Sequence, residues 1–567
     1  MTLKGYGRSL SCARLTVLLL CGLLARNRVV VAQSKPAAST SVRLREAGVA
    51  FRAGHDAFLR NDLAVAHREF ARAVLLAPQV AAAHSAFGAV LLAEGASRAA
   101  ISELRIAHQL DPKDEDTTLN LATALASTRQ TSAAQQLVAS AISTTPDSAA
   151  LHDTLGTLLA QQNQFDQAIP EFQRALALDS NLASAHFHLG SIYLDQRKVE
   201  VALEELNRAH TLVPDAPTYT LQLGRALSAT NRDEEAIATL RTATVQDPSS
   251  VDAKYELALA LQASGDAAGA LPLFERVTRT RPRNSAALTN HALALVQTGD
   301  AKQAIPLYLR ALKIDTTSAT LHEDLGVAYL QQSDLDHAIE QFRAGLRVDP
   351  QNPQLHYDLG LAYKLKDDLT AAIPEFERSA TLNPSLSDPP YTLGVIFMQQ
   401  GRFAESRDQL EHAVALRPGN GDAWITLGNV YKQTNQPNQA VDALRRGIAL
   451  LPDQPSPHIT LAAIYSQQGN NAEALAERKV AAHLSRVAVN RQHANFALES
   501  ARALFKRNQL AEAATQLESA ITADPGYAEP HGMLAEVLTR QGRIAEAALE
   551  RQKAGQLAVQ EPAALHP

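Results

Sequence analysis

Seven histidines are the residues whose type and spacing most directly suggest chemistry. The distance between successive members is a multiple of the distance from His152 to His186, except that His531 comes five residues late. The seven are His84, His152, His186, His322, His356, His458 and His531. Imidazole is a common zinc ligand, but the ligands of one ion must converge to about 2 Å, whereas helices that each carry one histidine pack about 10 Å apart. We therefore expect these side chains to pack between helices, as Trp424 does at the same place, and predict no metal site.

No pattern typical of a catalytic site stands out elsewhere. The sequence contains no H-E-x-x-H, G-x-x-x-x-G-K-[ST] or G-x-S-x-G pattern. Both cysteines, Cys12 and Cys21, lie within the segment 1–32, so a chain without this segment has no thiol for catalysis, disulfides or metal binding. We predict a protein that is not an enzyme and needs no cofactor.

A second set of residues is suited to binding. It comprises aromatic, apolar, amide and lysine side chains at related places of three successive stretches of the chain: Tyr357, Lys364, Tyr391, Met398, Gln399, Asn429, Lys432 and Gln433, with Ile425 among them. Aromatic rings could anchor an extended peptide, amides could pair with its backbone, and lysines could meet its acidic groups. The alternative is that these residues are the ordinary lining of a helix surface.

These residues must be positioned by a structure that repeats at the same interval as the histidines. Proline recurs with this period at Pro78, Pro112, Pro146, Pro214, Pro248, Pro282, Pro350, Pro384, Pro418 and Pro452. Gly or Ala precedes each of these prolines by the same distance, as Gly54 precedes Pro78. A fixed period of about 34 residues is the signature of a solenoid, in which one small structural unit is stacked many times.

Small residues indicate how each unit packs as two helices. When Ala47 is taken as the first place of the first unit, the eighth place is Gly or Ala in all fifteen units, and the twentieth is Ala in fourteen. Small residues at helical spacing let two helix axes approach closely. Pairs such as Gly265-Asp266 and Gly401-Arg402 fall midway through their units, where the first helix is expected to end.

Helix geometry separates groove residues from core residues. Places two, five, nine and twelve form one stripe at 100° per residue, more than 90° from the stripe that holds the small eighth place. Because the small places must face neighbouring helices, we expect the first stripe to line a groove. The binding candidates belong to this stripe or lie beside it.

This combination resembles the tetratricopeptide repeat family. Two units carry the resemblance clearly, through Leu393-Gly394, Phe397, Phe403, Leu410, Ala413 and Pro418 in one and Trp424, Leu427-Gly428, Tyr431, Ala440, Leu444 and Pro452 in the other. The resemblance covers about residues 41–560. It implies an all-α, right-handed superhelical solenoid of about fifteen antiparallel helix pairs, with a concave groove for contacts with proteins.

One irregularity divides the array. The step from Ala462 to the equivalent Ala501 is five places longer than the regular step, and Arg478 stands where earlier units have an apolar residue. Terminal repeats need a polar outer face because no neighbour covers it. We predict repeats 1–13 over residues 41–486, a cap-like break near residues 478–495, and a segment 487–567 that holds the slip, repeats 14 and 15 and a C-terminal cap.

The segment 1–32 differs from the rest of the chain. Basic residues precede an apolar run over residues 15–24, which resembles a secretory signal peptide and is shorter than the roughly 20 residues that span a bilayer. Residues 33–40 are predicted to be a linker. We expect a periplasmic or secreted protein, with cleavage after Ala25 or Ala32 left open; the alternative is a retained membrane anchor.

Charge limits the class of partner. The formal net charge is −6, and it becomes −11 without residues 1–32, which hold five basic and no acidic residues. This balance offers no broad basic surface for nucleic acid or anionic lipid. The predicted function is a non-enzymatic scaffold that binds proteins or extended peptides, with membrane contact only if the N-terminal segment is retained.

Two alternative functions stay open. The array is similar to the repeat arm of O-linked N-acetylglucosamine transferases, which carries asparagine at the sixth place, although Asn120 and Asn290 are the matches to this asparagine ladder. The other alternative is an assembly factor for a secretion or polysaccharide machine of the cell envelope.

Overall fold

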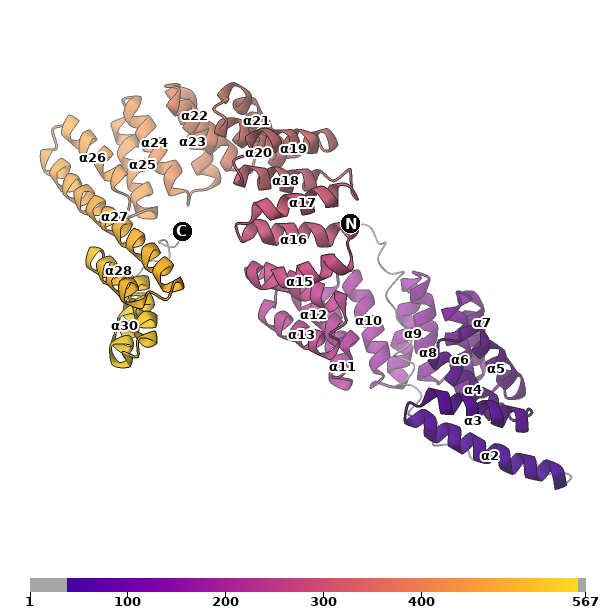
Figure 1. Cartoon of the computed structure of the whole chain (residues 1–567). Helices are drawn as coiled ribbons and strands as arrows, with labels where there is room; N and C mark the ends of the chain where they lie inside the picture. Colours follow the sequence, from indigo (N-terminus) through magenta and orange to yellow (C-terminus); the bar gives the residue numbers. More distant parts are fainter. Residues whose placement is uncertain (1–37, 559–567) are drawn as a thin grey trace. The chain divides into compact units, whose positions relative to one another are not determined.

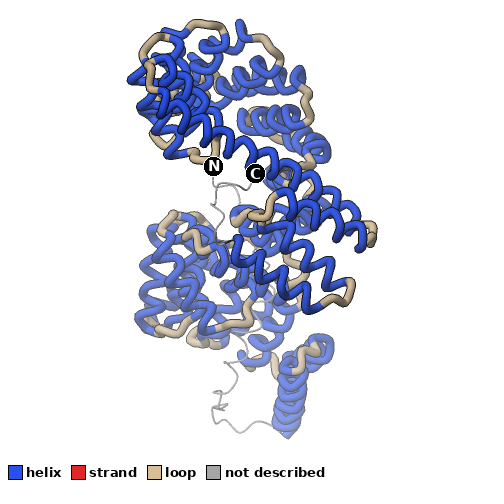
Figure 2. The backbone as a smooth tube through the Cα atoms, turned by 90° about the vertical axis from the view of Figure 1, so that its left-hand side faces the viewer, coloured by secondary structure: helices blue, strands red, loops and turns tan. Residues whose placement is uncertain are grey.

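The computed structural model describes residues 38–558, with side chains from residue 41 onward. The predicted signal segment 1–32 lies outside the described residues. The described part of the chain contains 29 helices, α2 to α30, and no strand (Figure 2). None of these helices is long and apolar enough to cross a membrane. The prediction of an all-α solenoid of antiparallel helix pairs is confirmed.

The described residues form two compact units, which are divided between Gly299 and Asp300 and are described separately. The first contains α2 (Ala38–Leu59), α3 (Leu63–Leu76), α4 (Ala81–Ala93), α5 (Ser97–Leu110), α6 (Glu115–Ser127), α7 (Thr131–Thr144), α8 (Ala149–Gln161), α9 (Phe165–Leu178), α10 (Ala183–Asp195), α11 (Val199–Leu212), α12 (Pro217–Ala229), α13 (Asp233–Gln246), α14 (Val251–Ala263), α15 (Ala267–Thr280) and α16 (Ser285–Gln297). Helix α2 begins at Ala38, inside the segment 33–40 predicted as a linker.

The second unit contains the remaining helices. They are α17 (Ala301–Leu312), α18 (Ala319–Gln331), α19 (Leu335–Val348), α20 (Pro353–Leu365), α21 (Leu369–Leu382), α22 (Asp388–Gln399), α23 (Phe403–Leu416), α24 (Gly421–Gln433), α25 (Pro437–Leu450), α26 (Pro455–Gln467), α27 (Asn471–Lys506), α28 (Leu510–Ala523), α29 (Ala528–Arg540) and α30 (Ile544–Ala558).

Each repeat is an antiparallel pair of helices, such as α4 with α5 or α20 with α21 (Figure 1). The close packing of each pair depends on the small eighth place. A Cβ atom added to Gly326 on α18 would lie 2.4 Å from Cε1 of Phe342 on α19, and Phe342 is fully buried. The same relation recurs between Gly156 and Phe172, at 2.8 Å. A larger residue at the eighth place therefore has no room unless the helices separate.

Short turns reverse the chain between the two helices of a repeat. In the turn between α20 and α21, Asp367 has a φ of 63°, in the left-handed region. Asp368 then caps α21 by accepting a hydrogen bond from the backbone N–H of Ala371 at 3.0 Å. Gly401 takes the left-handed place between α22 and α23, with a φ of 74°. The sequence prediction that first helices end midway through their units is confirmed.

The first helices of successive repeats form the more closely spaced layer of each unit. Helix α4 contacts α6 and α6 contacts α8 in the first unit, and α18 contacts α20 and α24 contacts α26 in the second. A stack in which one layer is more closely spaced curves toward that layer. Within each unit the first helices therefore line the inner face and the second helices the outer face.

Helix α27 replaces the predicted break. It runs without interruption for 36 residues and serves as both the second helix of repeat 13 and the first helix of repeat 14. The prediction of a cap-like break near residues 478–495 is therefore wrong. The physical reason is that Arg486 replaces the proline that follows second helices elsewhere, and neither Gly nor Pro occurs between Gly469 and Pro525 to interrupt the helix.

We predict that Gly326→Ala destabilises the second unit by about 1–3 kcal/mol, because the added methyl group overlaps the ring of Phe342. Hydrogen exchange of the backbone amides in α18 and α19 measures the loss locally, which suits a repeat array better than one global unfolding transition. Gly419→Ala is the matched control, since a Cβ there meets no atom within 4 Å. Equal exchange rates in both variants would contradict the packing argument.

Candidate functional site

The predicted binding residues lie on the first helices of repeats 10, 11 and 12, in the second unit. Gln399 and Gln433 lie at the ends of α22 and α24, and both are exposed. The other members of the set are half-buried: Tyr357, Lys364, Tyr391, Met398, Asn429 and Lys432. Ile425 does not line the groove as predicted, because it is 6% exposed. Gly447 on α25 leaves the space that Ile425 fills, since a Cβ at Gly447 would lie 2.5 Å from Cγ1 of Ile425.

The two tyrosines join neighbouring repeats. Tyr357 on α20 is hydrogen-bonded to Thr392 on α22, and Tyr391 on α22 is hydrogen-bonded to Thr426 on α24. Burial raises the pKa of both phenols above the ordinary value, and the ring of Tyr357 also lies 5.5 Å from that of Phe376. Their hydroxyl groups are therefore engaged within the protein, so a ligand would meet the ring edges rather than free phenols.

These bonds belong to a series that links the fifth place of one repeat to the sixth place of the next. In the first unit, Asn290 Nδ2 donates to the hydroxyl of Tyr255 at 2.8 Å, and Nδ1 of His188 lies 3.4 Å from Oδ1 of Asp153. We call this series the first-helix ladder. Its spacing was present in the sequence, but sequence reasoning did not identify it.

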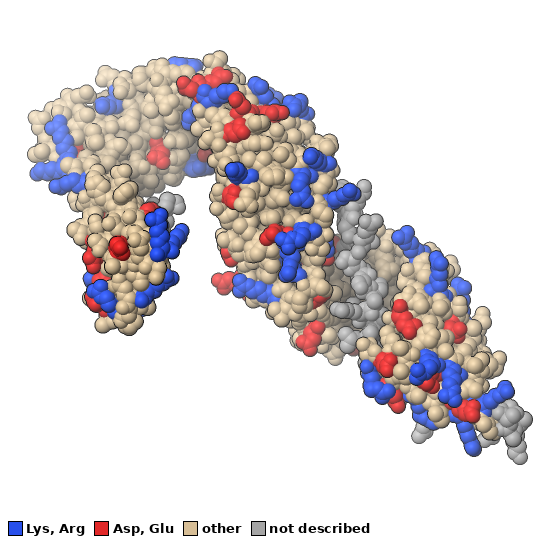
Figure 3. Space-filling model, viewed as in Figure 1, with Lys and Arg blue, Asp and Glu red and all other residues tan. Residues whose placement is uncertain are grey.

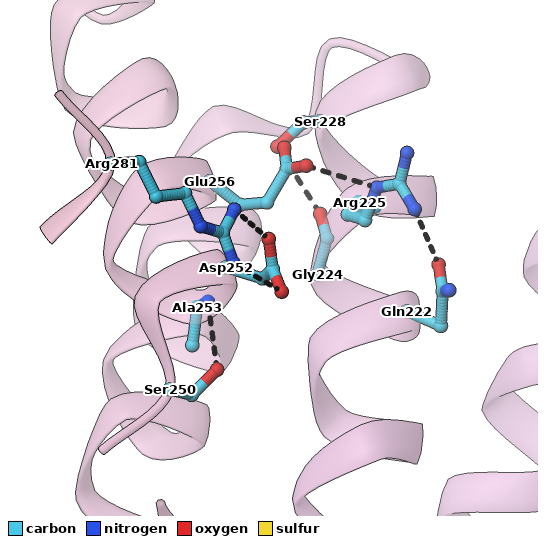
Figure 4. A network of polar contacts seen from close by, with 9 residues as sticks. All are labelled: Gln222, Gly224, Arg225, Ser228, Ser250, Asp252, Ala253, Glu256 and Arg281. Carbon is cyan, nitrogen blue, oxygen red and sulfur yellow. Dashed lines mark hydrogen bonds and ion pairs between the residues drawn. The ribbon is translucent and has the colours of Figure 1, made fainter. Parts of the chain in front are cut away.

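Charged residues stand at and beside the ladder in the first unit. Glu256, at a sixth place on α14, pairs with Arg225 on α12 at 3.2 Å, and burial raises the pKa of Glu256 (Figure 4). Arg281 pairs beside them with Asp252 at 2.6 Å. Each acid thus faces a cation from a neighbouring segment, which compensates for part of the cost of burying its charge.

One pair of places in the second unit carries two acids. Glu323 on α18 is at the fifth place of repeat 9, and Asp358 on α20 is at the sixth place of repeat 10. Elsewhere in the first-helix ladder, these two places hold a hydrogen-bond donor and an acceptor. Burial, followed by the negative charge of Glu323, raises the pKa of Asp358 to about 7, although the amide of Gln354 donates to it at 2.9 Å. Burial also raises the pKa of Asp324 to about 6. Sequence reasoning missed this acidic stretch of the inner face.

The recurrent histidines are packing residues. Nδ1 of His84 lies 2.6 Å from a carboxylate oxygen of Glu103, and its Nε2 lies 3.1 Å from the carbonyl oxygen of Pro78. Nδ1–carboxylate contacts of 2.5–2.6 Å recur at His152, His186, His356, His458 and His531, while His322 meets Gln341. Trp424 donates to the carbonyl of Pro418 at the same place. The expectation that these histidines pack between helices is confirmed.

No group of three or more His, Cys, Asp or Glu side chains within the described residues could hold a metal ion. A surface hollow of about 660 Å³ between α19 and the turn after α20 is lined by mixed charges, among them Glu340, Arg343 and Arg347. Lys366 and Asp336 pair across it, and Arg343 lies over the ring of Tyr363 at 5.5 Å. Neither charge sign dominates this hollow.

Comparisons with known proteins give one consistent result. Models of the tetratricopeptide repeat family match residues 91–158, 154–217, 221–261, 255–319, 328–367, 353–386, 397–456 and 504–564. These segments cover most of the chain, and 353–386 coincides with repeat 10. A comparison with curated proteins gave no match.

Several solved structures resemble the chain. They include the crystal structure of MamA (24% identity, 28% of this chain and 94% of that chain, TM-score 0.28), the APC/C hetero-tetramer Cut9-Hcn1 (14% identity, 88% and 98%, TM-score 0.38) and yeast Tom70 (16% identity, 78% and 92%, TM-score 0.34).

We predict that Asp358→Asn stabilises the protein at pH 8 but not at pH 4. Because the folded-state pKa of about 7 exceeds the ordinary 3.8, the folded state binds this proton more tightly, so stability falls as the pH rises from about 4 to about 7. Asparagine removes the buried charge and can still accept from Gln354. Thermal unfolding should show an increase in Tm of about 2–4 °C at pH 8.

Asp336→Asn is the control for this experiment. Asp336 is exposed, and its hydrogen bond with Lys366 lowers its pKa, so its replacement should give no increase at pH 8. A gain of the same size for Asp358→Asn at both pH values would show that its charge is not the cause.

Proposed function

The chain belongs to the tetratricopeptide repeat family, and from this premise we propose that it is a non-enzymatic, exported scaffold that binds partner proteins through extended acidic peptide segments on the inner face of repeats 10–12. A stack of helix pairs of this family is suited to protein–protein interaction.

The observation that carries the proposal is the pair of uncommitted lysines on this face. Lys364 on α20 and Lys432 on α24 are half-buried, and the structure gives neither an ion-pair partner among the described residues. They lie two repeats apart, or about 20 Å at a helix spacing of about 10 Å. An extended chain advances about 3.3 Å per residue, so acidic groups about six residues apart could reach both lysines.

The surrounding side chains support a peptide in extended form. Met398 and the ring edge of Tyr391 offer apolar contacts on α22, between the helices that carry the two lysines, and the ring edge of Tyr357 adds to them on α20. The amides of Gln399 and Gln433 can pair with a peptide backbone. Asn429 already accepts a hydrogen bond from the hydroxyl of Thr460 at 3.0 Å, which holds its amide in a fixed orientation. The face is therefore ordered before a ligand arrives, which lowers the entropy lost on binding.

The use of the sixth place weighs against the alternative of a glycosyltransferase repeat arm. Thr392, Thr426 and Asn290 at this place bond to the fifth-place residue of the preceding repeat. In this chain, the residues at the sixth place therefore do not form a column of asparagines that is free to bind a peptide backbone. This favours a scaffold whose contacts come from the ring edges at the fifth place and from side chains at the ninth, twelfth and thirteenth places.

We predict that a photo-crosslinking residue at Gln399 or Gln433 captures partner proteins in living cells and that the same residue at Glu377, exposed on α21 of the outer face, does not capture them. The double variant Lys364→Glu/Lys432→Glu should reduce capture at Gln433 by about tenfold or more, since each unfavourable pair costs of order 1 kcal/mol. The double variant Lys302→Glu/Arg378→Glu changes charge equally on second helices and should leave capture unchanged. Identical captured proteins from both faces would refute the proposed face.

Export is tested separately by fractionation of the cells that produce the protein. The predicted signal segment supports a product that begins at Arg26 or Gln33 and is located outside the cytosol. N-terminal sequencing of the mature product distinguishes the two cleavage positions. A full-length product that stays in the cytosol would overturn export and leave the binding proposal untouched.

A further inference from the structure

The middle of α27 is bare in a way that the second helices of regular repeats are not. Residues 482–493 join repeat 13 to repeat 14, and nine of these twelve residues are exposed. Ala482 is exposed, whereas the residues at the same place of regular second helices, such as Leu346 on α19 and Ile448 on α25, are half-buried. Here the next pair begins within the same helix, so it cannot fold back over this surface.

The exposed surface of α27 carries a regular stripe. Seven exposed residues follow one another at alternating steps of four and three: Leu475, Lys479, Ala482, Arg486, Val489, His493 and Phe496. These steps place all seven side chains on one side of the helix. We call this set the α27 stripe.

Apolar and basic residues alternate along the α27 stripe, and each kind recurs every seven residues. Apolar residues occupy one position of the period, and basic residues or histidine occupy the other. Three apolar members are strongly exposed, with Leu475 at 53%, Val489 at 49% and Phe496 at 80%. The stripe spans about 32 Å at a rise of about 1.5 Å per residue. A heptad spacing of this kind is the geometry by which one helix packs along another in a coiled coil.

The charge of this surface is of one sign. No acidic residue occurs between Glu477 and Glu499, and within the described part of the chain Lys479 and Arg486 have no ion-pair partner. Arg491 points elsewhere and pairs with Asp524. Lys and Arg side chains gather at the left-hand margin of Figure 3, where Figure 1 labels α26 and α27.

We propose that the α27 stripe is a second docking surface, which binds an acidic amphipathic helix of a partner protein as a two-stranded coiled coil. The partner helix would set apolar residues against Leu475, Val489 and Phe496 and carboxylates against Lys479 and Arg486. Burial of the apolar members supplies the attraction, and the cations restrict it to acidic helices.

Other occupants fit this surface less well. In a second copy of this chain, Lys479 would face Lys479 in a parallel pair and Arg486 would face Arg486 in an antiparallel pair, which is unfavourable in both directions. An anionic membrane requires a broad apolar helix face, whereas a cation or histidine interrupts the stripe after every apolar residue.

The test uses the full chain and a fluorescein-labelled synthetic helix of about four heptads, with Leu at one core position and Glu at the other. We expect saturable binding by fluorescence anisotropy. The variant Lys479→Glu/Arg486→Glu should bind at least about tenfold more weakly. The same variant should bind a peptide with Lys in place of Glu more tightly than the wild type does. Arg98→Glu/Arg105→Glu on α5 is the control of equal charge change and should leave binding unchanged.

Three results would overturn the proposal. The first is no binding of the acidic helix, or equal binding of a peptide with the same composition in scrambled order. The second is a wild-type dimer in sedimentation that is lost on Phe496→Asp, which would make the stripe an interface between copies. The third is flotation with phosphatidylglycerol vesicles that Lys479→Glu/Arg486→Glu abolishes, which would make it a lipid-binding surface. Circular dichroism of each variant establishes that the helices are intact.

Discussion

The contact between the small eighth place of a first helix and the large side chain at the twenty-fourth place of its partner determines how far apart the helices stand. A Cβ at Gly428 would lie 2.6 Å from Leu444, and one at Gly326 still closer to Phe342. Since the pairs are held at this short separation, they stack at constant spacing and the first helices approach one another. The first-helix ladder exists because of that approach: Tyr255 and Asn290 could not bond across a wider gap.

Because the spacing of the helix pairs is constant, the side chains of the inner face can differ between repeats without altering the fold. The ladder places hold a neutral pair at Tyr357 and Thr392, and two acids at Glu323 and Asp358. The neutral pair satisfies its own hydrogen bonds, whereas burial beside a second acid raises the pKa of Asp358 and favours its protonated form. The charge and hydrogen bonding of the inner face can therefore change with single side chains, because the packing between the helices of each pair is set by the small residues of the eighth place.

Periodicity in the sequence predicted the helices, their turns and the packing role of the histidines, because all of these repeat with the same local environment. It did not predict which residues of the groove stripe are buried between helices. Ile425 lies on the expected stripe but sinks toward α25 because Gly447 offers space. Nor did it predict that the hydroxyls of Tyr357 and Tyr391 are engaged. Both outcomes depend on pairs of residues in different helices, which a stripe on a single helix does not reveal.

The slip in the repeat shows the limit most clearly. The sequence showed the position of the slip. Whether the helix ends or continues there depends on residues that interrupt helices, and neither Gly nor Pro occurs between Gly469 and Pro525. Continuation has a consequence for packing. Arg478 stands at the twenty-fourth place, where every other repeat except the last, which has Arg551, buries an apolar or aromatic residue, and Arg478 is exposed on α27. The contact that closes each repeat is therefore missing at repeat 13, no helix pair covers its outer side, and the α27 stripe is left to face solvent or a partner.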